Sequence, residues 1–144
     1  MAVYQTNSEQ ETMELGAQLA RSLTGGSVVA MFGGLGMGKT AFVRGMAQVL
    51  APGAAVTSPT FALVHEYGGN PPLCHFDMYR VESWEDLYST GFFDYLDGGA
   101  VLAIEWSENI ENALPVGSYL VEFERAGDTE RRITITRKTE DETL

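Results

Sequence analysis

The sequence has little cysteine, little positive charge and no long apolar run. Its one cysteine, Cys74, excludes an internal disulfide and a cysteine-rich zinc site. Because Cys74 lies in the apolar residues 73–78, we expect a buried packing thiol, with catalytic thiol chemistry beside His75 as the alternative. The apolar runs are too short to span a membrane, and residues 1–10 lack the basic start and apolar stretch of a signal peptide. We therefore expect a cytoplasmic protein that does not contact membranes.

The scarcity of positive charge limits what the surface can bind. Asp and Glu number 20 against 9 Lys and Arg, which gives a net charge of −11 at pH 7. A large nucleic-acid surface needs clustered Lys and Arg, so any RNA is expected to be held through a partner. We expect one domain formed by residues 1–137, followed by an acidic, disordered tail formed by residues 138–144.

The sequence contains one complete nucleotide-binding motif. Residues 33–40 read G-G-L-G-M-G-K-T, a phosphate-binding loop of the form G-x-x-x-x-G-K-[ST]. The loop follows the apolar residues 28–32 and precedes a segment with helical periodicity. Backbone N–H groups and a helix N-terminus can then hold phosphates, with Lys39 on the β and γ phosphates of ATP and Thr40 on Mg²⁺. The residues expected to contact the nucleotide here are Gly34, Leu35, Gly36, Met37, Gly38, Lys39, Thr40 and Ala41.

The hydrophobic pattern predicts an α/β protein with a single P-loop NTPase-like domain, in which helices flank a mixed β-sheet. Ser8 and Glu11 form a capping box for a first helix that the Gly25-Gly26 pair ends. Ser83 caps a short helix. Spacing favours the core for the aromatic residues 84, 88, 92 and 93, with an exposed partner surface as the alternative. The first expected strand, residues 27–32, leads into the loop. The other expected strands are residues 61–67 and 73–78, residues 100–104, and residues 118–124 and 131–136, with antiparallel hairpins at 61–78 and 118–136.

Two polar clusters precede or lie in the first of these hairpins. Residues 57–60, T-S-P-T, are predicted to form a loop in which Thr60 senses the γ-phosphate, with ordinary turn chemistry as the alternative. In H-F-D-M-Y-R, alternation places His75, Asp77 and Tyr79 on one face of a strand. A carboxylate in an apolar strand needs a partner, so Asp77 either serves Mg²⁺ or forms an ion pair with Arg80 or His75.

A third cluster follows the buried strand at residues 100–104. Ligands of open α/β sheets gather outside the carboxyl ends of strands, and Glu105 stands at such an end. We expect Glu105 to hold Mg²⁺ or to orient the attacking water. Trp106, which comes next, is interpreted as a core or interface residue.

These stretches, taken in this order, resemble the TsaE family, also called YjeE, over about residues 8–136. The resemblance rests on the loop together with T-S-P-T-F, H-F-D-M-Y-R and I-E-W-S-E, which begins at Ile104. It implies a Mg²⁺-dependent ATPase, weak alone, that works with TsaB and TsaD in threonylcarbamoyl modification of tRNA adenosine next to the anticodon. It further implies catalytic roles for Glu105, Asp77 and Lys39, metal binding by Thr40, Glu105 and Asp77, a switch-like loop containing Thr60, and functional importance for Trp106.

The chain departs from the common G-D-L-G-A-G-K-T-T form of that family at Gly34, Met37 and Ala41. Phosphate binding should survive these changes, because it depends on backbone N–H groups, Lys39 and Thr40. Two other functions stay open: a non-hydrolysing ATP-sensing module and a small P-loop kinase. A GTPase is disfavoured because the sequence has no N-K-x-D guanine motif. Arg80 and Arg44 are the candidates for a transition-state arginine from the chain itself, and residues 8–12 for contact with adenine.

Overall fold

A computed structural model describes residues 2–34, 38–56 and 64–139. They form alternating strands and helices, as the periodicity predicts. The elements, in chain order, are β1 (Ala2–Thr6), α1 (Glu9–Ala20), β2 (Val28–Phe32), α2 (Lys39–Leu50), β3 (Val64–Gly69), β4 (Pro72–Asp77), α3 (Trp84–Ser89), α4 (Phe92–Asp97), β5 (Val101–Glu105), the 3₁₀ segment η1 (Ser107–Ala113), β6 (Tyr119–Arg125) and β7 (Arg131–Arg137).

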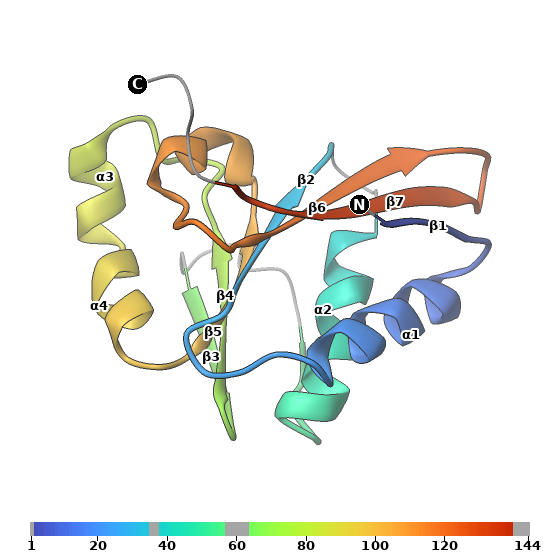
Figure 1. Ribbon diagram of the computed structural model, residues 1–144, viewed down its shortest axis with the longest axis horizontal. Coiled ribbons are helices and arrows are strands. Elements are labelled where there is room, and N and C mark those ends of the chain that lie inside the picture. Colours follow the sequence, from blue (N-terminus) through green and yellow to red (C-terminus); the bar gives the residue numbers. More distant parts are fainter. Residues whose placement is uncertain (1, 35–37, 57–63, 140–144) are drawn as a thin grey trace.

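The strands form one seven-stranded sheet in the order β1-β7-β6-β2-β5-β4-β3. Strand β2 runs parallel to β5 and β6, and β5 runs parallel to β4, whereas the β3–β4, β6–β7 and β1–β7 pairs are antiparallel. The predicted mixed sheet and both predicted hairpins are therefore confirmed. Strand β2, which leads into the phosphate-binding loop, is the central strand of the sheet (Figure 1). The loop therefore starts in the middle of the row formed by the strand ends.

Helices cover both faces of the sheet. In Figure 1, α1 and α2 lie on one side and α3 and α4 on the other. Successive residues of β2 alternate between the two layers: Val29 and Met31 pack in the core under α1 and α2, while Val28 and Ala30 pack in the opposite core. All four side chains are at most 2% exposed, which explains why β2 reads as a continuous apolar run.

Two glycines let α1 and α2 pack with their backbones close together. A Cβ atom on Gly16 would lie 2.1 Å from the Phe42 carbonyl oxygen, and one on Gly45 would lie 1.8 Å from the Met13 carbonyl oxygen. Both positions lie inside a helix, where glycine costs conformational entropy relative to alanine. The close approach of the helices therefore explains glycine at both sites.

Changing Gly45 to Ala is expected to lower the free energy of unfolding by about 3 kcal/mol, because the clash is with backbone that cannot rotate away. Chemical denaturation would measure the change. Gly98→Ala is the control, since Gly98 has an ordinary helical φ of −82° and a Cβ there would meet its nearest atom at 3.3 Å. Equal stability of the two variants would contradict this explanation.

Several local predictions need correction. Helix α1 ends at Ala20 rather than at the Gly25-Gly26 pair, and Leu23 is buried beyond its end. Strand β1 was not predicted; it pairs with β7 at the sheet edge. Lys138, which the sequence places at the start of the tail, donates hydrogen bonds from its Nζ to the Leu114 and Glu111 carbonyls. Residues 140–144 lie outside the described part of the chain.

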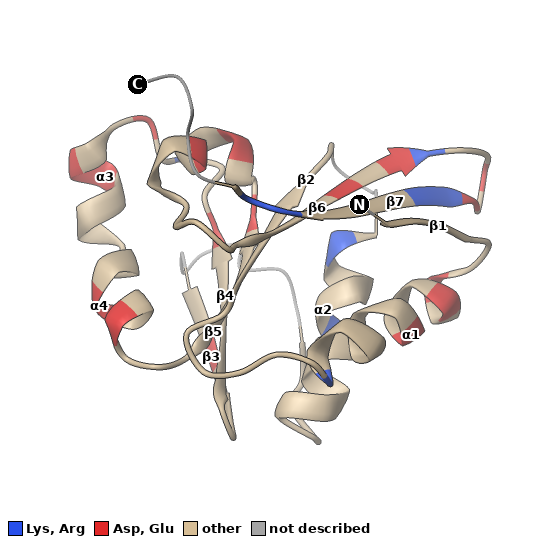
Figure 2. Cartoon of the chain, in the orientation of Figure 1, with Lys and Arg blue, Asp and Glu red and all other residues tan. Residues whose placement is uncertain are grey.

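The expectation that the aromatic residues of α3 and α4 enter the core is wrong for two of the four. Phe92 is fully buried and Phe93 partly buried, but Trp84 is 55% and Tyr88 65% exposed. Helix α3 has only six residues and buries a single position, Leu87. Figure 2 shows acidic residues on these two helices as well as on α1, and cations scattered over α2 and the β6–β7 hairpin.

Candidate nucleotide-binding site

The two ends of the loop after β2, at Gly33 and Gly38, have backbone features that suit a phosphate site. Gly33 has φ +133°, and a Cβ there would lie 2.8 Å from the Phe123 carbonyl oxygen, so only glycine fits. Gly38, with φ +95°, is the N-cap of α2 and has no side chain to cap the helix. The first N–H groups of α2 therefore remain available to an anion.

The structure places the other residues of the loop in different surroundings. Gly34 is exposed, and Thr40 is half-buried in the first turn of α2. Ala41 is 4% exposed, so only its backbone N–H faces a possible ligand at the helix start. Leu35, Gly36 and Met37 lie outside the described residues, as does the predicted sensor loop with Thr60.

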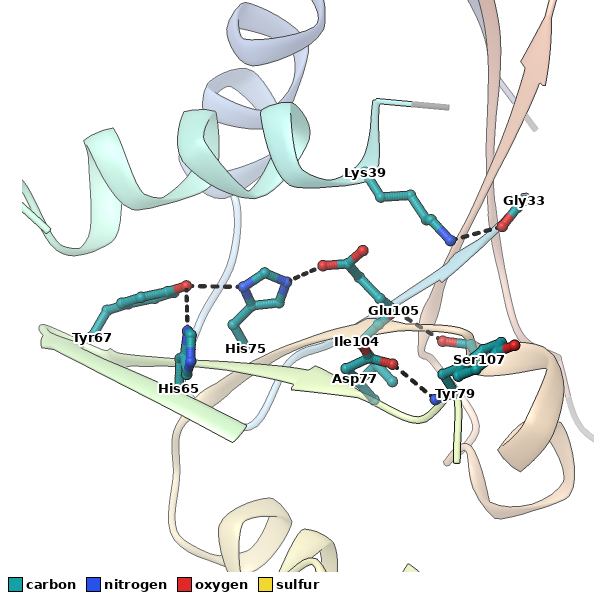
Figure 3. A network of polar contacts seen from close by, with 10 residues as sticks. All are labelled: Gly33, Lys39, His65, Tyr67, His75, Asp77, Tyr79, Ile104, Glu105 and Ser107. Carbon is teal, nitrogen blue, oxygen red and sulfur yellow. Dashed lines mark hydrogen bonds and ion pairs between the residues drawn. The ribbon is translucent and has the colours of Figure 1, made fainter. Parts of the chain in front are cut away.

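Lys39 is held inside the site. It is 4% exposed, and its Nζ donates a hydrogen bond to the Gly33 carbonyl at 2.7 Å (Figure 3). The same Nζ lies 4.4 Å from the centre of the Trp106 ring. Burial lowers the pKa of Lys39, while the charges of Glu105, Glu108 and Asp77 act in the opposite direction. A phosphate beside Nζ would add negative charge and favour the ammonium form further.

The two carboxylates predicted from sequence come together at the carboxyl ends of two neighbouring strands. Asp77 ends β4, Glu105 ends β5, and the parallel register pairs these two residues directly. Glu105 is 5% exposed, and Asp77 is partly buried and accepts a hydrogen bond from the Tyr79 N–H at 2.8 Å. Burial raises the pKa of Asp77, opposed by that hydrogen bond and reinforced by the charge of Glu105. The carboxylates thus sit where added positive charge is favourable.

His75 contacts a partner that the sequence pattern did not indicate. Its Nε2 lies 2.5 Å from Oε2 of Glu105, so the alternative ion pair between His75 and Asp77 is wrong. Tyr79 also departs from its predicted place, because β4 ends at Asp77 and Tyr79 is 60% exposed beyond it. The Tyr79 ring packs against Trp106, with the ring centres 4.9 Å apart.

Sequence reasoning missed two residues that hold this edge together. Oε2 of Glu108 accepts a hydrogen bond from the Gly33 N–H at 3.0 Å, which connects η1 to the loop. The Asn109 side chain donates to the carbonyls of Met78 and Tyr79, at 2.8 and 3.1 Å. Both lie in or just after I-E-W-S-E, and their polarity beside a buried strand was the only available signal.

Trp106 adopts φ +59°, the one positive φ of a non-glycine residue in the described chain. This left-handed conformation turns the chain sharply between β5 and η1 and brings the indole over Lys39. Such backbone conformations in non-glycine residues cost about 1–3 kcal/mol and cluster at functional sites. Trp106 is therefore part of the site, and it is partly buried against the core cluster beneath it.

We expect Trp106 fluorescence to report nucleotide binding. If Nζ of Lys39 moves from the indole face to phosphate oxygens, the charge next to the ring changes, and so should the emission. The chain has two tryptophans, so Trp84→Phe should preserve the response to ATP and Mg²⁺ and Trp106→Phe should abolish it. A response that persists in Trp106→Phe would contradict the predicted movement.

The remaining candidates lie around this centre. Arg44 on α2 forms a 2.9 Å ion pair with Glu9, and Arg80 is exposed. The first turn of α1 lies beside the loop, since a Cβ on Gly38 would meet the Thr12 methyl at 3.5 Å. The prediction that residues 8–12 contact adenine stays a prediction. Cys74 is 3% exposed and burial raises its pKa to about 11, which fits the predicted packing thiol.

The donor set fits magnesium bound together with phosphates. Thr40, Asp77 and Glu105 offer hard oxygen ligands, which Mg²⁺ prefers. Within the described ranges, no three His, Cys, Asp or Glu side chains gather to hold a metal by themselves. Phosphate oxygens and water would therefore complete the coordination, as is usual for Mg²⁺ at nucleotide sites.

In the described part of the chain, no helix combines the length and apolarity needed to cross a membrane.

Comparison with known proteins identifies the family of this chain. The family model described as threonylcarbamoyl adenosine biosynthesis protein TsaE matches residues 6–133. The chain belongs to the TsaE family. It is similar to the tRNA threonylcarbamoyladenosine biosynthesis protein TsaE of Treponema pallidum, with 38% identity over 130 residues, 90% of this chain and 96% of that protein. The protein of the same name from Bacillus subtilis is 39% identical over 135 residues, 92% of this chain and 84% of the relative.

A solved structure shares the fold of this TsaE family member. The crystal structure of Bacillus subtilis YdiB superposes with a TM-score of 0.78 and 34% identity, covering 94% of this chain and 84% of that one. Both the predicted family and the predicted fold class, a single-domain α/β protein with a mixed sheet, are confirmed. The departures at Gly34, Met37 and Ala41 therefore occur within a recognisable TsaE sequence.

Proposed function

We propose that this chain binds ATP with Mg²⁺ on residues 33–40 and hydrolyses it, in support of threonylcarbamoyl modification of tRNA adenosine beside the anticodon. Membership of a family described by that biosynthesis supports the biological process. The site supports the ATPase step. We further propose that the chain acts in the cytoplasm with TsaB and TsaD, and that tRNA is contacted through this complex, because a net charge of −11 disfavours a large RNA surface.

One observation carries the ATPase proposal: a buried lysine and two carboxylates from neighbouring parallel strands meet at the uncapped start of α2. On binding, Lys39 would exchange the Gly33 carbonyl for β- and γ-phosphate oxygens. Glu105 would orient a water that attacks the γ-phosphorus. The bond to the β–γ bridging oxygen then breaks, giving ADP and inorganic phosphate.

Thr40, Asp77 and Glu105 are the residues that would hold magnesium. Bound Mg²⁺ neutralises charge on the β- and γ-phosphate oxygens as it develops. The raised pKa of Asp77 supports this role, because a carboxylate that burial disfavours gains most from a nearby cation. The ionised form of Asp77 would therefore be more stable in the site loaded with Mg²⁺ than in the free chain.

We propose that hydrolysis is slow until the partners dock. An arginine facing the transition state contributes orders of magnitude in rate. Arg44 is already paired with Glu9, and Arg80 is exposed past the end of β4, so neither is positioned by the fold for this task. A partner's arginine is the proposed source of the missing charge.

Phosphate release from ATP and Mg²⁺ tests the proposal, using the chain alone and then with TsaB, TsaD and tRNA. We expect turnover to rise at least about tenfold with the partners, as an added arginine would provide. Equal turnover in both mixtures would contradict partner dependence. Tight binding without phosphate release in every mixture would select the ATP-sensing module, and consumption that requires a small-molecule acceptor would select a kinase.

A further inference from the structure

A line of hydrogen bonds crosses the sheet from its edge strand to Glu105. The Tyr67 hydroxyl lies 2.9 Å from His75 Nδ1, and His75 Nε2 lies 2.5 Å from Glu105 Oε2 (Figure 3). His75 is completely buried, Glu105 is almost completely buried, and Tyr67 is partly buried. The nucleotide site as described above needs Glu105 but makes no use of His75 or Tyr67.

Strand register produces this line. His75 pairs with Ala103 on β5, so the next residue on the same face of β5 is Glu105. On the other side His75 pairs with His65 on β3, and Tyr67 follows His65 on the same face, next to the irregular register between Glu66 and Gly68. The three side chains therefore form one row across β3, β4 and β5, on the face that α2 covers.

Donors and acceptors match along the row. An ionised carboxylate can only accept, so we assign the proton between His75 and Glu105 to Nε2. In the neutral ring Nδ1 then accepts the Tyr67 O–H, which sets both the tautomer and the orientation of the imidazole. One oxygen of Glu105 is held in this way, and the other points away from His75, toward the side on which α2 begins (Figure 3).

We propose that His75, oriented by Tyr67, is a positioning residue that holds Glu105 for catalysis, an inference that rests on the proposed ATPase function. By binding Oε2, the imidazole directs the free Oε1 toward the water and the phosphates. The arrangement follows a common logic, in which a reacting or metal-binding group is oriented by a second group that is itself oriented by a third. Tyr67 is the third group here.

The kinetic test compares four variants in the full chain. His75→Leu keeps the volume but removes the donor, Tyr67→Phe removes the hydroxyl, and His75→Gln restores an N–H toward Glu105. His65→Gln is the matched control, because His65 lies on the same face and its Nδ1 makes a long 3.5 Å hydrogen bond with the Tyr67 hydroxyl, whereas Glu105 is bound by His75. We expect kcat to fall about 10- to 100-fold in His75→Leu, to fall less in Tyr67→Phe, and to recover largely in His75→Gln.

Two further measurements separate positioning from general stability. The Kd of a non-hydrolysable ATP analogue with Mg²⁺ should stay within about twofold of the original in all four variants, and so should the secondary structure by circular dichroism. An unchanged kcat in His75→Leu would overturn the proposal. A parallel loss of analogue binding and kcat that His75→Gln does not rescue would also overturn it.

Nuclear magnetic resonance of the imidazole nitrogens tests the contact without any turnover. The chain has two histidines, so His65→Gln assigns the signals of His75. We expect a protected N–H at Nε2 of His75 that changes in Glu105→Ala and not in the exposed control Glu122→Gln. An exposed, exchanging ring would overturn the inference. If the unaltered chain releases no phosphate, the proposed function fails together with the catalytic consequence, while the spectrum still decides whether the contact exists.

Discussion

Replacing Glu105 with glutamine is expected to lower the turnover of ATP by about 100- to 1,000-fold, in the range that a positioned general base contributes. Glutamine keeps the size of the side chain and can still contact His75, but it cannot carry the negative charge that orients and deprotonates water. Nucleotide affinity should change much less than kcat, because in the proposed site Lys39 and the N–H groups at the start of α2 would hold the phosphates. Phosphate release under saturating ATP and Mg²⁺ measures the effect.

Glu122→Gln is the control for this variant, since it removes the same charge from an exposed position on β6. It should turn over ATP at the original rate. If both variants retain that rate, Glu105 has no catalytic role, and its burial beside His75 is purely structural. If Glu105→Gln instead loses nucleotide binding in proportion to turnover, its main role is to hold Mg²⁺.

Replacing Lys39 with alanine is expected to weaken ATP binding by about 10- to 100-fold, the equivalent of the 1.5–3 kcal/mol typical of hydrogen bonds to charged groups. In the free chain, burial lowers the pKa of Lys39, so the ammonium is retained at a cost. Phosphate charge would repay that cost on binding. Titration calorimetry with ATP and Mg²⁺ measures the loss.

The chain has only two lysines, which makes Lys138→Ala a matched control. Nζ of Lys138 contacts the Leu114 and Glu111 carbonyls at the end of η1 and has no part in the loop. Its removal should leave ATP binding intact. A Kd for Lys39→Ala that stays within about twofold of the original would mean that the backbone N–H groups alone bind the phosphates.

Much of the fold followed from local patterns. The apolar run of β2, the glycines of the loop and the periodicity of α2 predicted a strand, turn and helix in the right order. Helix α1 was recognised by its Ser8 cap but extended too far, because Leu23 continues the apolar spacing after the helix has ended. Strand β1 was missed because it lies at a sheet edge with only alternate burial. Edge strands and helix ends have weak hydrophobic patterns in the sequence, and this weakness explains both prediction errors.

The sequence predicted individual residues of the candidate site but not the contacts between their side chains. Lys39 was predicted from the loop motif, Asp77 from alternation within a strand and Glu105 from its place after a strand. The parallel register brings Asp77 and Glu105 together. The sequence offered His75 only as an alternative ion-pair partner for Asp77, because the two residues are neighbours on one strand face. The true partner, Glu105, is thirty residues away, and the crossover between β4 and β5 had to be known first.

The amino-acid sequence by itself determined the phosphate-binding loop, the mixed α/β architecture and the TsaE resemblance, because these depend on local spacing and on residue types at fixed intervals. Only the tertiary structure decided which side chains meet: His75 with Glu105, and Lys39 with Trp106. Those contacts depend on strand order and on the left-handed turn at Trp106. A hydrogen bond or a cation over a ring requires atoms within a few ångströms, and packing of distant segments sets that distance.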